Sequence, residues 1–107
     1  MVRSPKFTLV FAPQVIKHLD GIESKYHGLL RQIIKEQLTH TPNDETRNRK
    51  PMESPAPFAA TWELRCGPQN RFRVLYDVDL EAGTVSVLAI GVKDRNRLVI
   101  GNEEYKS

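Results

Sequence analysis

Two runs of alternating side chains, Thr61–Arg65 and Phe72–Val78, carry the residues best suited to chemistry. Alternation with a period of two predicts strands with one buried face and one open face. A short link of turn-forming residues joins the runs, so an antiparallel pair would gather Glu63, Arg65 and Arg73 on one surface. Arginine suits phosphate, because its planar fork matches two oxygens and stays charged. The alternative is structural: Glu63 then only neutralises a surface arginine pair, and Arg73 supports the sheet or an incoming segment of a partner protein.

The other face of these strands is apolar. Trp62 and Tyr76 alternate with the charged side chains, so we expect both in the core and not on a base-stacking platform. A third run, Thr84–Val92, follows a hairpin-length turn and completes a three-strand meander. The side chains expected on the apolar face are Trp62, Leu64, Cys66, Phe72, Val74, Tyr76 and Val78.

The elements that must hold this meander precede it. Lys6–Phe11 alternates as a short strand, and Pro13 suits the first position of a short amphipathic helix that ends near Gly21. Ser24–Leu38 has apolar residues at helical spacing, with its first serine as N-cap. The predicted fold class is α+β, in the order β-α-α-β-β-β. Its small antiparallel-rich sheet has the helical hairpin on one face, and the charged face is free.

The connections are uneven in length. His40–Pro57 spans about 18 residues with four prolines and a basic run, longer than usual, so we expect it to be functional or mobile. Leu98–Gly101 is a candidate last strand, and residues 101–107 form a polar tail expected to be mobile. We expect a single domain over residues 1–107.

Charge is unevenly distributed along the chain. Residues 47–97 carry nine Lys or Arg against six acids, whereas residues 1–46 carry six against five; the net charge is +3. Such a patch suits a phosphate backbone, and the alternative is a solvated surface of mixed charge.

Several site types find no support in the sequence. A single cysteine excludes an internal disulfide, and Cys66 has no partner for a metal site or a nucleophile. His18, His27 and His40 lack the spacing of a helix-borne metal pair, so we expect surface or helix-edge positions and no metal or cofactor. No apolar run reaches the roughly 20 residues of a membrane span, and the N-terminus lacks a signal core. A cytoplasmic location is expected.

The central motifs resemble a known family. Trp62-Glu63-Leu64-Arg65, then Arg73–Val78, then Val87–Gly91 before a basic turn, look like the RelE/ParE superfamily of type II toxin–antitoxin toxins. Phe11-x-Pro13 and the helical hairpin fit as well, so the resemblance covers about residues 7–97. It implies the RelE/ParE-like fold and one of two activities. RelE-like members cut mRNA in the ribosomal A site, and ParE-like members poison DNA gyrase.

The resemblance also implies site residues. Arg73 matches the arginine used on the scissile phosphate, and Arg65 matches the basic end of the Trp-x-x-Arg strand. Thr61 and Glu63 stand where RelE has two lysines, and the terminal catalytic tyrosine has no obvious match. Implied catalytic residues are Arg73, Arg65, Glu63, Lys93 and Arg95. Implied RNA-binding residues are Lys50, Arg49, Arg47, Arg71, Arg97 and Tyr105.

The favoured hypothesis is therefore a metal-independent, ribosome-dependent mRNA endoribonuclease that inhibits translation. Glu63 would be the base, and Lys93, Arg95 or Tyr105 would be the acid by position only. The alternatives are a gyrase inhibitor without nuclease activity and an inactive antitoxin-binding homologue. The implied partners are a cognate antitoxin, laid over the charged face or the helical hairpin, and mRNA on the ribosome or, alternatively, gyrase. The free toxin is expected to be a monomer.

Overall fold

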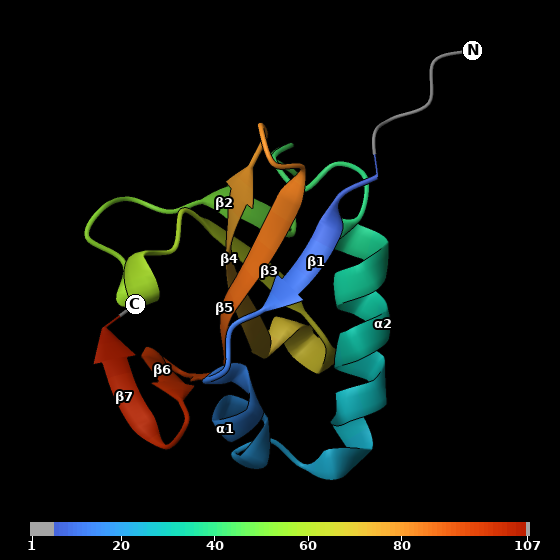
Figure 1. Ribbon diagram of the computed structural model, residues 1–107. Helices are drawn as coiled ribbons and strands as arrows, with labels where there is room; N and C mark the ends of the chain where they lie inside the picture. Colours follow the sequence, from blue (N-terminus) through green and yellow to red (C-terminus); the bar gives the residue numbers. More distant parts are fainter. Residues whose placement is uncertain (1–5, 107) are drawn as a thin grey trace.

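The computed structural model describes residues 6–106; the expectations for residues 1–5 and for residue 107 lie outside this range. Within it, two helices lie on one side of a seven-stranded sheet, which confirms the predicted α+β class (Figure 1). The helices are α1 (Val15–Asp20) and α2 (His27–Leu38). The strands are β1 (Thr8–Phe11), β2 (Arg49–Pro51), β3 (Trp62–Cys66), β4 (Phe72–Asp79), β5 (Thr84–Asp94), β6 (Arg97–Ile100) and β7 (Glu103–Lys106).

The predicted meander is the centre of the sheet. Antiparallel pairing of β3 with β4 sets Glu63 opposite Leu75 and Arg65 opposite Arg73. The long strand β5 pairs with β4 along its length and offers its other edge to two partners. The first half of that edge pairs in parallel with β1, and the last residues pair with β6. The first strand therefore joins the same sheet, as expected.

Three local predictions were wrong or incomplete. Ser24 does not cap α2, because it begins a separate 3₁₀ turn, and α2 starts at His27 without a side-chain cap. The 40–57 connection contains β2, which lengthens the sheet by one strand beyond β3. The polar tail is not an unpaired extension, since residues Glu103–Lys106 pair with β6 as β7. The order of elements thus gains β2, β6 and β7.

The main core lies between the helices and the sheet. Leu30, Ile34 and Leu38 of α2 pack with Leu64 and Val74 of the sheet, and all are almost fully buried. Trp62 and Tyr76 belong to this layer as predicted, with stacked rings 6.2 Å apart. Side chains of this size stabilise by about 1.5–3 kcal/mol each when buried, so this layer dominates the stability of the fold.

The opposite face is not wholly free, contrary to the prediction. A second, smaller cluster lies there, made of Ala60, Leu75, Ala89, Leu98 and Ile100, with Met52, Phe58, Leu88 and Tyr105 packed against it. β6 reaches this face by crossing closely over Gly91: a Cβ added there would lie 2.7 Å from the Val99 carbonyl oxygen. Only glycine allows that approach. The charged residues consequently lie in a groove and not on an open plane.

No helix among the described residues has the length and apolar character needed to cross a membrane.

Candidate functional site

A groove of about 320 Å³ opens on the face opposite the helices. Its floor is the sheet, and one wall is the chain that follows β2. We call it the charged groove. Its lining residues are Lys50, Pro51, Met52, Glu53, Pro55, Ala56, Pro57, Glu63, Arg65, Arg73, Lys93 and Leu98. Four of these are basic and two are acidic, so the lining carries a formal charge of 4 − 2 = +2.

One carboxylate links the two arginines at the centre of the groove. The Glu63 Oε1 atom accepts a hydrogen bond from Arg65 Nε at 3.0 Å and another from Arg73 at 3.3 Å. The side chains of Glu63 and Arg73 are 13% and 12% exposed, whereas that of Arg65 is 44% exposed. The inner pair is thus largely shielded from water, and Arg65 faces the opening. Shielding strengthens such charge-assisted bonds relative to surface pairs.

The inner arginine is incompletely satisfied. The Arg73 Nε–H is buried and has no hydrogen-bond partner among residues 6–106. A buried donor left without a partner costs about 1–3 kcal/mol. Arg49 Nε, on the helix side, is also buried without a partner, so an unpaired Nε does not by itself mark a ligand site. Arg73 suits an anionic ligand because its guanidinium lines the groove beside one carboxylate.

β2 sends two neighbouring basic residues to opposite faces. Lys50 pairs across the ladder with Glu63, lines the charged groove, and binds Glu45 Oε2 at 3.3 Å. Arg49 pairs with Leu64 and points to the helix side, where it is buried. Its guanidinium donates to the Gln37 carbonyl oxygen at 2.5 Å and to Thr41 Oγ1 at 3.2 Å. Arg49 thus ties β2 to the end of α2, and its burial does not fit the predicted RNA contact.

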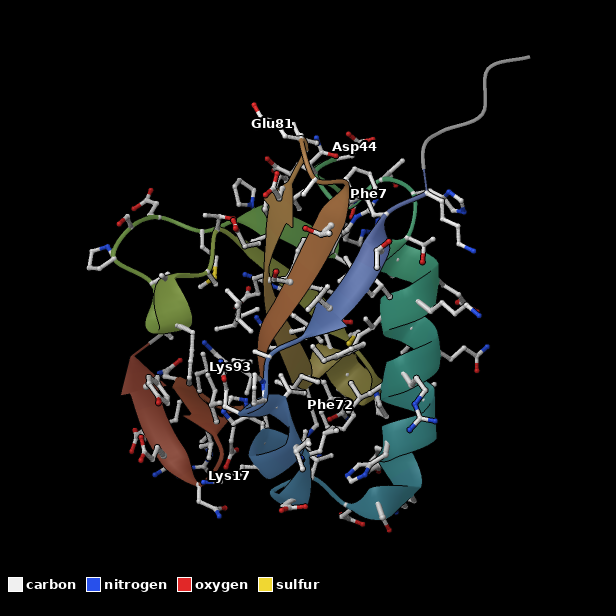
Figure 2. The ribbon with its side chains drawn as sticks, viewed as in Figure 1. Phe7, Lys17, Asp44, Phe72, Glu81 and Lys93 are labelled. Atoms are coloured by element: carbon white, nitrogen blue, oxygen red, sulfur yellow. The ribbon has the colours of Figure 1, made fainter. Side chains whose placement is uncertain are left out.

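The remaining predicted residues are dispersed. Lys93, which pairs with Leu98 of β6, lines the charged groove, whereas Arg95 lies exposed in the turn before β6 with φ of 57°. In Figure 2 Lys93 lies toward β6, and Phe72 lies toward the helices. Arg47 and Arg97 are exposed and outside the lining of the groove. Five of the eleven predicted residues line it: Lys50, Glu63, Arg65, Arg73 and Lys93.

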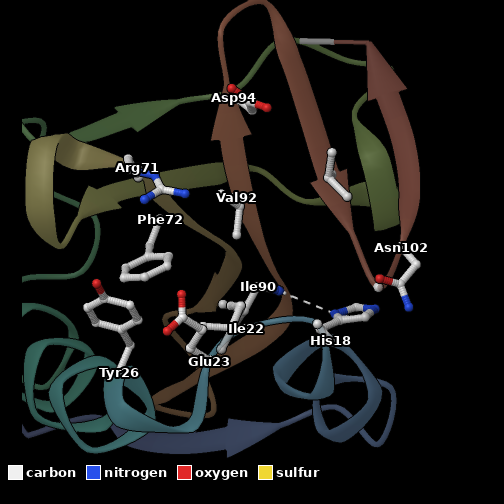
Figure 3. Close-up of a pocket in the computed structure, with 13 residues that line it drawn as sticks. His18, Ile22, Glu23, Tyr26, Arg71, Phe72, Ile90, Val92, Asp94 and Asn102 are labelled. Atoms are coloured by element: carbon white, nitrogen blue, oxygen red, sulfur yellow. Dashed lines mark hydrogen bonds between the residues drawn. The ribbon is translucent and has the colours of Figure 1, made fainter.

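Arg71 belongs to a different hollow. Figure 3 shows this pocket of about 250 Å³ on the helix side, where Arg71 lies near Phe72, Tyr26 and Glu23. Arg71 precedes β4 and has helical backbone angles at the end of the 3₁₀ turn Pro68–Asn70, so it does not follow the alternation that turns Arg73 toward the charged groove. The predicted RNA-binding role of Arg71 would need a second surface.

Tyr105 lies beside the charged groove without lining it. Its ring packs at 5.6 Å from that of Phe58, and its hydroxyl donates to Glu103 Oε2 at 3.2 Å. Burial and the Glu103 carboxylate raise the pKa of Tyr105, because both disfavour the phenolate. A neutral phenol can donate a proton. Tyr105, however, pairs with Leu98 of β6 and packs against the second cluster, so its hydroxyl is not placed in the charged groove.

Two histidines and the cysteine lie in the fold away from the charged groove, and His40 is exposed as predicted. His18 was predicted at the surface, but it is buried, and its Nδ1 atom accepts the Ile90 N–H at 3.3 Å (Figure 3). His27 Nε2 lies 2.9 Å from the Leu19 carbonyl oxygen. Burial raises the pKa of the Cys66 thiol to about 11, so its thiolate is disfavoured at neutral pH. Among the described residues, no group of three His, Cys, Asp or Glu side chains could hold a metal.

Sequence reasoning missed the wall of the groove. Met52, Pro55 and Pro57 line it, and Leu98 closes the other side. The signal that was present is the unusual length of the proline-rich 40–57 connection, which predicted a functional or mobile segment. Which of its residues would face the charged side chains depends on the path back to β3, and composition does not specify that path.

The fold has a counterpart among solved structures. The chain aligns with a protein in the crystal structure of the toxin–antitoxin complex RelBE2 from Mycobacterium tuberculosis, with a TM-score of 0.67 and 22% identity. The alignment covers 83% of this chain and 93% of the other. No protein-family model and no curated protein matches the sequence. The likeness shows that the chain has a RelE-like fold, as the sequence motifs predicted.

The geometry of the charged groove defines what chemistry is available there. Two guanidinium groups and two ammonium groups line a shallow groove with a carboxylate at its centre. Such a set can bind an anion, stabilise negative charge that develops on it, and accept a proton from a neighbouring hydroxyl.

Proposed function

We propose that this protein is the toxin of a type II toxin–antitoxin module and that it cleaves mRNA on the ribosome. The observation that carries the proposal is the Arg65–Glu63–Arg73 network at the floor of a basic groove. A RelE-like fold, shared with a protein of a toxin–antitoxin complex, supports the proposal by analogy. The arginine pair suits a phosphodiester, and the central carboxylate suits the removal of a proton from a hydroxyl.

The cleavage step uses the RNA as its own nucleophile. The 2′-hydroxyl attacks the adjacent phosphorus while Glu63 accepts the hydroxyl proton. A bond forms between O2′ and phosphorus, and the bond from phosphorus to the 5′ oxygen breaks. The products are a 2′,3′-cyclic phosphate and a 5′-hydroxyl, and the leaving oxygen takes a proton from a general acid. Lys93 is the predicted acid candidate that lines the charged groove.

Glu63 must exchange partners for this step. Its Oε1 atom is bound by both arginines, so a carboxylate now occupies the position that suits a phosphate oxygen. Substrate phosphate would draw Arg65 and Arg73 away from Glu63 and leave its carboxylate free to act as base. The two arginines would then stabilise the pentavalent phosphate, a contribution typically of about 10²–10³ in rate for each well-placed donor.

The ribosome supplies what the groove lacks. The groove is shallow and surrounds only part of any bound strand, and positioning alone can contribute about 7–11 kcal/mol to such reactions. A ribosome that holds the codon in a fixed conformation would provide this positioning. The nuclease is therefore proposed to act on translated mRNA and not on free RNA.

The antitoxin is proposed to bind the helical hairpin. An apolar groove of about 340 Å³ lies there, lined in part by Phe11, Ile16 and Leu19, and the Phe11 and Ile16 side chains are exposed. Exposed apolar side chains of this kind favour a protein partner over a small polar ligand. This surface and the charged groove lie on opposite faces of the sheet.

The test is primer extension on a reporter mRNA after a brief pulse of expression, with wild type, Arg73→Ala and the control Lys17→Ala. Lys17→Ala removes one positive charge from the exposed side of α1. We expect discrete cuts within translated codons for wild type and Lys17→Ala, and at least about a 100-fold loss for Arg73→Ala. Growth arrest with intact mRNA and an induced DNA-damage response would contradict the proposal and favour gyrase. If expression causes no growth arrest and no mRNA cleavage, the result would favour an inactive antitoxin-binding homologue.

A further inference from the structure

The wall of the charged groove is held at its start by Met52 and at its end by the aromatic ring of Phe58. The wall comprises residues 52–57, which run between β2 and β3. At its start the Met52 N–H donates to the Thr61 carbonyl oxygen at 2.9 Å, and at its end the Ala60 N–H donates to the Pro57 carbonyl oxygen at 3.2 Å. Between these bonds the chain forms no strand, and Pro55 and Pro57 have no N–H to donate.

The Phe58 ring lies between two other elements. Its centroid is 5.2 Å from the His18 ring of α1, in an edge-on arrangement with an interplanar angle of 67°. It is also 5.6 Å from the Tyr105 ring of β7. Figure 1 shows the short turn after the wall lying beside β7. One side chain therefore connects the wall to the N-terminal helix and to the C-terminal strand.

The backbone at this position is strained. Phe58 has φ of 60° and ψ of 19°, and Ala59 follows with φ of 57°. The left-handed region is unfavourable for a bulky side chain, and such residues persist only where surrounding contacts determine the conformation. The two aromatic contacts and the packing of Phe58 against the second cluster can hold it there, together with the turn hydrogen bond from the Ala59 N–H to the Ala56 carbonyl oxygen.

We propose that Phe58 is a positioning residue: its ring holds the wall against α1 and β7 and thereby sets the width of the charged groove for an RNA strand. The proposal rests on the proposed function. The wall lines the groove together with Arg73 and Lys93, but Phe58 itself does not. Without the ring, substrate binding must also order the wall, so apparent affinity falls while the chemistry at Arg73 is unchanged.

The experiment compares the full-length wild type with Phe58→Leu, Phe58→Tyr and Leu88→Ala. Phe58→Leu removes the ring, Phe58→Tyr keeps it, and Leu88→Ala removes apolar area from the same cluster at a residue that does not line the groove. The first readout is hydrogen exchange at the Met52 and Ala60 amides. The second is single-turnover cleavage of mRNA on purified ribosomes over a range of toxin concentrations.

For Phe58→Leu we expect faster exchange at both amides and a half-saturating concentration about tenfold higher, with the limiting rate within about twofold of wild type. For Phe58→Tyr and Leu88→Ala we expect the exchange rates and the half-saturating concentration of the wild type. Unchanged exchange in Phe58→Leu would overturn the proposal. So would a lower limiting rate with an unchanged half-saturating concentration, because that pattern reports a slower chemical step and not weaker binding. Toxin concentrations are those of the folded fraction, since unfolded protein alone would raise the apparent half-saturating concentration. If wild type itself does not cleave, the proposed function fails, and the exchange data alone still decide whether Phe58 holds the wall.

Discussion

The two faces of the sheet solve different physical problems with the same strands. The helix side buries a large apolar layer, and Arg49, which is buried there, donates to backbone and hydroxyl oxygens near the end of α2. The opposite side buries a smaller cluster and leaves a basic groove beside it, where Arg73 binds the Glu63 carboxylate, which we propose a substrate phosphate replaces. An arginine bound to neutral oxygens of the fold contributes stability, whereas one paired with a single displaceable carboxylate is available for binding.

The largest effect is expected from removing the negative charge of the Glu63 carboxylate, which tests the proposed role of the charged groove. Glu63→Gln keeps the size of the side chain and an oxygen for Arg65 and Arg73, but it lacks a basic carboxylate. We expect cleavage to fall by about 100-fold or more, since general base catalysis contributes typically 10²–10⁴. The measurement is the limiting rate of single-turnover cleavage on programmed ribosomes.

The matched control for this change is Glu81→Gln, in the exposed turn between β4 and β5. It should cleave like wild type. Full activity in Glu63→Gln would contradict the role of base and leave Glu63 as an ion-pair partner for the two arginines.

A second test uses neighbouring residues of β2. Arg49→Ala removes hydrogen bonds from a buried charged donor to Gln37 and Thr41, and we expect a loss of about 1.5–3 kcal/mol in the free energy of unfolding. Lys50→Ala removes a partly exposed pair with Glu45, so unfolding should change by no more than about 0.5 kcal/mol. Urea unfolding measures both.

Cleavage assays complete this pair of variants. Lys50→Ala should cleave more weakly than wild type because it removes a positive charge from the charged groove, at full stability. Arg49→Ala should cleave normally at temperatures where it remains folded. The reverse pattern would mean that the two faces are misassigned.

The alternation of apolar and polar residues in β3 and β4 made the charged face predictable. β2, β7 and the wall of the groove show no such alternation and could not be placed from the sequence. Glu63, Arg65 and Arg73 lie in runs where every second residue is apolar, so their shared surface follows from the sequence alone. β2 is three residues long and ends in a proline, too short to show a period, so nothing separated buried Arg49 from groove-lining Lys50. β7 is mostly polar because it is an edge strand, and Tyr105 packs its ring against the second cluster. The wall of the groove depends on a long-range contact between Phe58 and that strand.

The smallest expected effect concerns the helix side and its pH dependence. The His18 Nδ1 atom must be unprotonated to accept the Ile90 N–H, and burial lowers the pKa of His18 below its ordinary value of 6.5. Glu23, Asp94 and Asn102 line the same pocket, and Phe58 packs against the ring. The unfolded chain therefore binds a proton more readily than the folded one. The contribution of His18 to stability is complete above about pH 6.5 and is lost as the pH falls from there through the lowered pKa, by at most about 1.4 kcal/mol per pH unit.

Urea unfolding between pH 7.5 and pH 5, compared for wild type and His18→Gln, measures this slope. The variant should be less stable at pH 7.5 and should lose less stability on acidification. Equal slopes would mean that His18 has the same pKa in the folded and unfolded states, and that acid sensitivity of the helix side arises elsewhere.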